Sequence, residues 1–244
     1  MNLKEKVEDI FDITAQPAVD ILSSMFFEGI VGSVVPGVAS VILAYKQKRS
    51  EKMIVEFMIE TKKRQQVLED KLIQLEEERF VEIKGKYFGL VLDYVMENKQ
   101  EEKIEYLVNG FINLVSMEEL QEDVVLIYYD ILNSLNLLDI RVLKIYDFST
   151  RTEDYYDVLD DVGISHDQYT LIQNKLEQLG LLETKGQLQY EVLFENVKNI
   201  GEYLTNVERG KKVRLKYKKP NAGNIKSYNL TKLGLEFLKF FVEG

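Results

Sequence analysis

The sequence predicts a mainly α protein in which a helical bundle is followed by a smaller α+β domain with a small β-hairpin. Apolar residues recur at helical spacing through residues 1–136, and three short helices follow. Only one stretch, residues 212–218, alternates in the way that a strand does. With 244 residues, 45% of them apolar and 30% charged, the chain suits one large or two small globular domains. We therefore expect two domains, at residues 1–136 and 137–244.

The composition argues against an enzyme. The chain has no cysteine and a single histidine, His166, which is most simply an exposed polar residue. Zinc sites built from His and Cys, paired-His metal motifs and Ser-His-Asp triads are therefore disfavoured, and no Gly-rich phosphate-binding motif occurs. We expect no catalytic residue, no metal, no cofactor and no small-molecule substrate. A chain that needs no oxidising compartment also suits the cytoplasm.

Residues 26–45 form an apolar segment that contains Gly and Pro. No charge occurs from Gly29 to Tyr45, but Pro36 interrupts a run that is already shorter than the roughly 20 residues of a spanning helix. The segment is either two buried helices that meet at a turn, or a hairpin or surface segment that contacts a membrane or a partner. The residues that would make such a contact are Phe26, Phe27, Val34, Val35, Pro36, Val38, Val41 and Ile42.

A long charged helix is predicted after this segment. Its apolar seam follows spacings of four and three: Ile54, Met58, Thr61, Gln65, Leu68, Leu72 and Leu75. Because two polar residues interrupt the seam, we favour a helix packed within the bundle over a dimeric coiled coil. Further helices around residues 90–95, 104–114 and 120–131 complete the bundle.

The second domain begins with three short helices. They are predicted at residues 138–148, 155–162 and 165–179, with Gly163 after the second and Ser165 capping the third. On the third helix, the residues expected to face inward are Leu171, Ile172, Leu176 and Leu179. This layout is typical of a helix-turn-helix. A further helix at residues 191–207 is predicted as an insertion.

Residues 212–218 predict a strand with a basic, exposed side and with Val213, Leu215 and Tyr217 buried. A turn and a second strand at residues 225–230 would complete a hairpin, the wing of a winged-helix-like domain. The net charge is −10, yet residues 209–232 carry nine Lys or Arg and no acidic residue. The candidate residues for binding an anion or a partner are Lys211, Lys212, Arg214, Lys216, Lys218, Lys219 and Lys226. They suit nucleic acid, anionic lipid or the acidic surface of another copy.

Three stretches of the chain carry a family resemblance: residues 129–146, 176–182 and 229–237. Within residues 105–242, the chain resembles the C-terminal half of the Abi-alpha abortive-infection proteins of bacteria and their phages. The resemblance implies a role in phage defence. It implies no catalytic residues.

Two classes of function remain: a non-enzymatic interaction or effector protein of bacterial or phage origin, and a winged-helix transcription regulator. The third helix carries one Lys and no Arg, and the preceding stretch is acidic at Glu153, Asp154, Asp157, Asp160 and Asp161. DNA-reading helices rely on cations, so we favour the interaction protein. We expect a protein partner or self-association, with membrane association open and nucleic acid disfavoured.

Overall fold

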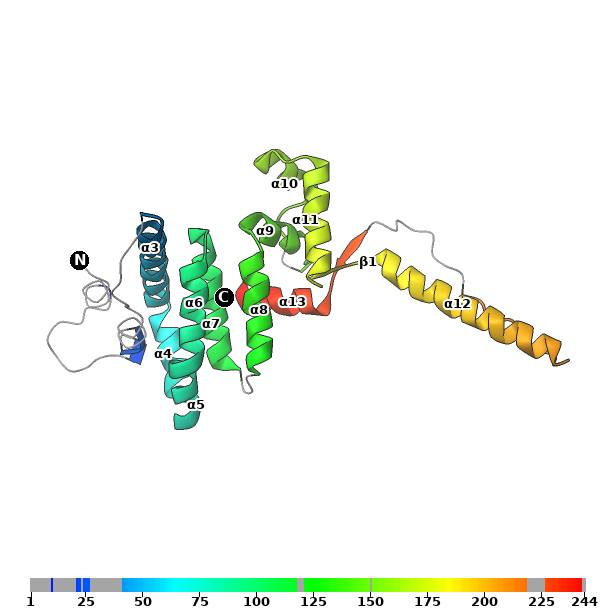
Figure 1. Ribbon diagram of the computed structural model, residues 1–244, viewed down its shortest axis with the longest axis horizontal. Helices are drawn as coiled ribbons and strands as arrows, with labels where there is room; N and C mark the ends of the chain where they lie inside the picture. The colour runs from blue at the N-terminus through cyan, green and yellow to red at the C-terminus, as the bar shows by residue number, and fades with distance from the viewer. Residues whose placement is uncertain are drawn as a thin grey trace. The chain divides into compact units, whose positions relative to one another are not determined.

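The fold is mainly α, as the sequence predicts, and its described sheet has two strands. The computed structural model describes residues 10, 21–22, 24–26, 41–117, 121–149, 151–218 and 227–242 (Figure 1). The chain divides into two compact units, the first formed by residues 1–137 and 237–244 and the second by residues 138–236. The predicted boundary after residue 136 lies one residue away. The end of the chain differs from the prediction, because it belongs to the first unit.

The described helices of the first unit follow one another with short connections. They are α3 (Val41–Lys63), α4 (Gln65–Ile73), α5 (Glu77–Glu82), the π-helical turn η1 (Ile83–Tyr87), α6 (Phe88–Glu97), the 3-10 turn η2 (Glu101–Lys103), α7 (Ile104–Ser116) and α8 (Glu122–Ser134). The long helix expected after the apolar segment is broken at Arg64, between α3 and α4. Five of its seven seam residues, Ile54, Met58, Thr61, Leu68 and Leu72, are buried. This seam is therefore packed within the unit, and the buried Thr61 hydroxyl donates to the Phe57 carbonyl at 2.7 Å.

Aromatic side chains form the centre of the first unit. Phe26 packs edge-on against Phe88 at a centroid distance of 5.0 Å, and Phe88 packs against Phe111 at 5.5 Å. Phe241, at the end of the chain's last helix, is fully buried and packs edge-on against Tyr129 at 5.2 Å. These contacts join residue 241 to helices more than a hundred residues earlier in the chain, so local sequence patterns could not place it.

The second unit contains α9 (Leu137–Ile145), α10 (Tyr155–Val162), α11 (His166–Gln178), β1 (Leu182–Thr184), α12 (Lys185–Glu208), β2 (Tyr228–Leu230) and the start of α13 (Lys232–Phe241). The predicted helix ends are confirmed here. Ser165 caps α11 with a capping box, and Gly163 ends α10 with φ of 70°. A helix covers the predicted residues 191–207, although α12 begins at residue 185 rather than 191. On α11, Ile172 and Leu176 are buried as expected, but Leu171 is 68% exposed, which corrects its predicted inward position.

The predicted hairpin is wrong. β2 pairs antiparallel with β1, with Leu182 opposite Leu230, and residues 211–218 form no strand. Val213 and Leu215 are each 39% exposed and Tyr217 is 58% exposed, so the apolar side of the alternation has no core against which to pack. The alternating pattern alone cannot reveal whether a buried surface exists opposite it.

Candidate functional site

The predicted basic residues lie on an exposed, irregular segment, residues 211–218, which we call the basic arm. It follows α12 after Gly210, which has the left-handed φ of 70°. The backbone N–H of Lys218 donates to Asn196 Oδ1 at 2.9 Å, and Asn196 Nδ2 donates to the Lys218 carbonyl at 2.6 Å. Lys218 Nζ also forms an ion pair with Glu195 at 2.8 Å. The arm therefore returns to α12 and is fixed there by one buried asparagine.

Five of the seven candidate basic residues belong to this arm, and all five are exposed: Lys211, Lys212, Arg214, Lys216 and Lys218. Lys219 and Lys226 lie outside the described residues. The structure thus places the five described basic residues on one exposed segment, which is irregular and not the predicted strand.

Helix α12, a long helix in Figure 1, has two different sides. The side that holds the arm carries Val192, Asn196, Asn199, Tyr203 and Asn206, all buried or half-buried. A second side, which we call the α12 apolar face, consists of Tyr190, Leu193, Phe194, Val197, Ile200, Leu204 and Val207, each between 40% and 81% exposed. Soluble proteins rarely leave so many large apolar side chains together on the surface without a partner.

The α12 apolar face has the spacing of a helix-packing seam. Residues 190, 193, 197, 200, 204 and 207 alternate by three and four, the spacing of coiled coils. Gly201 lies on the same face, and nothing in the described structure lies within 4 Å of the position that its Cβ would take. A glycine inside a helix costs about 1 kcal/mol relative to alanine. No contact with the described residues of the second unit explains this cost, whereas an approaching partner would.

The apolar segment at residues 26–45 is described only in part. Phe26 is fully buried among aromatic residues of the first unit, so its side chain belongs to the core. Phe27, Val34, Val35, Pro36 and Val38 lie outside the described residues, as do the side chains of Val41 and Ile42, whose backbone begins α3. Among the described helices, none is both long and apolar enough to cross a membrane.

The histidine and the acidic stretch have structural partners. His166 Nδ1 lies 2.6 Å from the Tyr155 hydroxyl, and Arg141 pairs with both Glu153 and Asp161 at 2.7 Å. Over the described ranges, no three His, Asp or Glu side chains group as metal ligands do. The single Lys of α11, Lys175, pairs with Asp139 at 2.5 Å.

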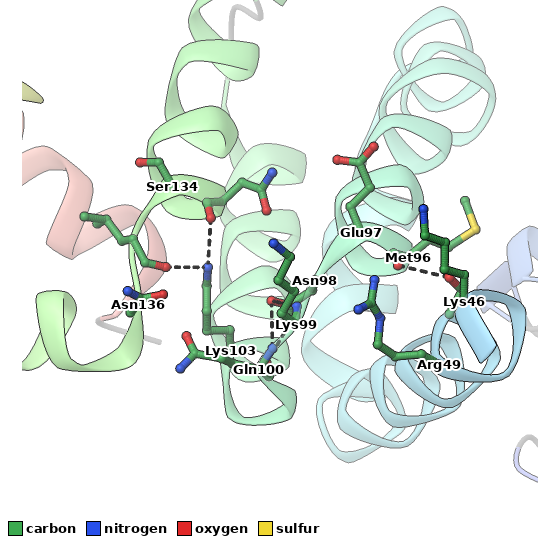
Figure 2. A pocket seen from close by; sticks show the side chains of 13 residues that line it. Lys46, Arg49, Met96, Glu97, Asn98, Lys99, Gln100, Lys103, Ser134 and Asn136 are labelled. Atoms are coloured by element: carbon green, nitrogen blue, oxygen red, sulfur yellow. Dashed lines mark hydrogen bonds between the residues drawn. The ribbon is translucent and has the colours of Figure 1, made fainter. Parts of the chain in front are cut away.

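The first unit also has a polar cleft of about 670 Å³ that the sequence did not predict, which we call the α3–α8 cleft (Figure 2). It is lined by the start of α3, the end of α6, the connection that follows α6, and the end of α8. The lining residues are Lys46, Arg49, Ser50, Met96, Glu97, Asn98, Lys99, Gln100, Lys103, Asn133, Ser134, Leu135 and Asn136. Four of them are cationic and one, Glu97, is acidic. Their positions span 91 residues of sequence, so no local motif signals the cleft.

Lys103 supports one wall of this cleft. Its side chain is buried, and Nζ donates to the carbonyls of Leu132 and Leu135, both at 2.7 Å. Helix α8 ends at Ser134, and the last carbonyls of a helix lack partners within it. The ammonium group therefore caps α8 and also adds a fixed positive charge at the negative end of its dipole.

Arg49 has a different environment. Its Nε is buried, and no acceptor for it occurs in the described part of the chain. Figure 2 shows the guanidinium extending from α3 toward the segment that carries Asn98 and Lys99. An unpaired buried N–H is uncommon in folded proteins and indicates strain or an absent partner.

Comparison of the chain with protein-family models, with curated proteins and with solved structures finds no match in any of the three. The function must therefore be argued from the α12 apolar face, the basic arm and the α3–α8 cleft themselves.

Proposed function

We propose that the protein is a non-enzymatic interaction protein that pairs with a second copy of itself through the α12 apolar face. The observation that supports this most is the exposed seam of alternating three- and four-residue spacing on a 24-residue helix, which is about 36 Å long.

The occupant that suits this seam is another α12. Read in either direction, the seam has the same spacing, so an antiparallel copy matches it position by position. Tyr190 then meets Val207 of the second copy, Leu193 meets Leu204, and Val197 meets Ile200. A two-fold contact of this kind needs one self-complementary surface, which is the commonest arrangement in homo-oligomers.

Phe194 and Gly201 add a second match. Phe194 is 81% exposed, and Gly201, two turns further along the same edge of the helix, leaves a gap in the face. In the antiparallel pair, each Phe194 comes beside the Gly201 of the other copy. A large side chain then fills a space that a Cβ would occupy, which gives the glycine a purpose.

The free energy available is sufficient for a modest dimer. Fully burying a large apolar side chain is worth about 1.5–3 kcal/mol, so half-exposed ones gain about 1 kcal/mol each. Seven such residues on each copy supply roughly 14 kcal/mol, against an association cost of roughly 4–15 kcal/mol. With a cost of about 6 kcal/mol, which lies within this range, about 8 kcal/mol remains, and we therefore expect a dissociation constant in the micromolar range.

The basic arm is fixed to α12 through Asn196, which is not one of the seam residues. In the pair, both arms stay exposed, and we propose that they contact an acidic partner protein. The transcription-regulator alternative receives less support, since the single Lys of α11 is held by Asp139 and the arm forms no wing.

The resemblance to the Abi-alpha family supports a role as an effector in phage defence. A direct test combines two readouts. Sedimentation equilibrium should show a mass that rises from one chain toward two over the micromolar range, and expression in a bacterial host should reduce plaque formation by infecting phages. A chain that remains monomeric at 100 times the expected dissociation constant would refute pairing. Unchanged plaque counts would refute the defence role while leaving pairing intact.

A further inference from the structure

We propose that the α3–α8 cleft binds the phosphate group of a small phosphorylated organic molecule of about nucleotide size. This site belongs to the first unit and is independent of pairing through α12, which belongs to the second. The cleft, its charge and the guanidinium of Arg49 support the inference together.

The cleft is positively charged, because four cations and one carboxylate line it. The chain is acidic overall, with a net charge of −10, and at least nine of its described cations have carboxylate partners. Arg79 pairs with Glu82 at 3.0 Å, and Lys86 pairs with Glu122 at 2.5 Å.

The cleft cations differ from these pairs. Lys46, Arg49 and Lys99 form no ion pair with any residue that the structure describes, although Glu97 lines the same cleft. A concave surface that gathers unpaired cations in an acidic protein concentrates positive potential at one place. Such a site attracts an anion rather than a neutral ligand.

Arg49 directs its guanidinium into the cleft. Its Nε is buried without an acceptor, while the guanidinium extends into the cleft (Figure 2). A guanidinium presents parallel N–H donors that match two oxygens of a phosphate, and such charge-assisted pairs are the strong hydrogen bonds of proteins. A phosphate in the cleft would accept from the guanidinium nitrogens that extend into it, whereas the buried Nε lies behind them.

Hydrogen bonds within the protein hold the walls of the cleft in place. Asn98 Oδ1 accepts from the Lys99 N–H at 2.9 Å, and Asn98 Nδ2 donates to the Gln100 carbonyl at 2.7 Å. Ser50 Oγ donates to the Met96 carbonyl at 3.1 Å and so links α3 to α6. Because the turn that carries Lys99 is held in place, an anion would bind with little ordering cost.

The cleft is large enough for a small organic molecule. About 670 Å³ lies within the range of small-molecule sites, roughly 300–1,000 Å³, and is far more than one phosphate group fills. Most of the remaining lining residues are polar, and they include the amides of Gln100 and Asn133. These amides suit the hydrogen-bonding edge of a base or sugar, so an organic phosphate fits better than the free ion.

The experiment is isothermal titration calorimetry of the full chain with ATP, inorganic phosphate and adenosine as probes. We expect ATP to bind, inorganic phosphate to bind more weakly, and adenosine to give no heat. Arg49→Gln should weaken ATP binding about tenfold or more, and Arg49→Lys by less, because the charge remains without the paired donors. Circular dichroism of each variant checks that the fold is intact.

The matched control is Lys48→Gln, which removes the same charge from the same turn of α3 at an exposed residue that does not line the cleft. It should leave ATP binding unchanged. Equal weakening by Lys48→Gln and Arg49→Gln would show attraction by general charge and overturn the site. Adenosine binding as tightly as ATP, or no heat with any phosphate at millimolar concentration, would overturn it as well. Phosphate binding as tightly as ATP would restrict the site to the free ion and overturn the organic ligand.

Discussion

Replacing Val197 with Asp tests the paired α12 seam at its centre. Val197 is 68% exposed in the single chain, so the folded monomer should lose little stability, since Val and Asp have similar helix propensities. In the pair, each new carboxylate would be buried beside Ile200 of the second copy, and both copies carry it. Loss of about 1 kcal/mol of apolar burial at each site, together with desolvation of each charge, amounts to at least about 4 kcal/mol per dimer.

This energy corresponds to a dissociation constant about 1,000-fold higher, so Val197→Asp should be monomeric at every practical concentration. The matched control is Leu171→Asp on α11, because Leu171 is also 68% exposed and lies off the seam. Light scattering coupled to gel filtration measures the mass of each variant. Pairing of Val197→Asp with unchanged affinity, or loss of pairing in Leu171→Asp as well, would refute the seam.

Three further predictions concern single residues. Gly201→Ala should raise the free energy of unfolding of the monomer by about 1 kcal/mol, because no described atom lies within 4 Å of the new Cβ. The same change should weaken pairing, because the Cβ would take the space that Phe194 of the second copy fills. Tighter pairing in sedimentation equilibrium would contradict this contact. Lys103→Met should lower the free energy of unfolding by about 2–5 kcal/mol in urea titration, since the carbonyls of Leu132 and Leu135 at the end of α8 lose their donor. A loss below about 0.5 kcal/mol would show that the cap is dispensable. Asn196→Ala should release the basic arm from α12. Trypsin should then cut after Arg214 several times faster, while the melting temperature changes little. Unchanged cleavage would mean that Asn196 does not hold the arm.

Local sequence patterns predicted the features of this fold that depend on neighbouring residues. Ser165 and Gly163 mark helix ends because a cap needs only the backbone of the next turn. The seam through Ile54 and Leu72 indicated burial, and both residues are buried, because the polar interruption at Thr61 is satisfied by the helix's own backbone.

Features that depend on distant contacts were not predicted. The alternation at residues 212–218 suits a strand, and the prediction paired it with the strand that became β2. In the structure β2 pairs instead with β1, some 45 residues earlier in the chain. For the same reason, Phe241 joins the first unit through Tyr129, although its helix begins in the second.

The α3–α8 cleft illustrates the same limit for a site. Lys46 and Arg49 stand out in the sequence only as the basic end of an apolar segment, and Lys99 and Lys103 only as ordinary surface charges. The fold brings them to one cavity. For the α12 apolar face, helical periodicity indicated the apolar residues. It could not indicate that the described chain leaves them exposed.

Pulsed EPR between spin labels on single introduced cysteines tests the antiparallel pair most directly, because the chain has no cysteine of its own. In an antiparallel pair centred between Lys198 and Asn199, the separation along the helices grows by two rises of about 1.5 Å for each residue from the centre. Labels at Thr205→Cys and Glu208→Cys should therefore lie about 20 Å and about 28 Å apart along the pair. Equal short distances at both positions would indicate parallel helices, and the absence of any defined distance would indicate that α12 does not pair; either result would contradict the proposed contact.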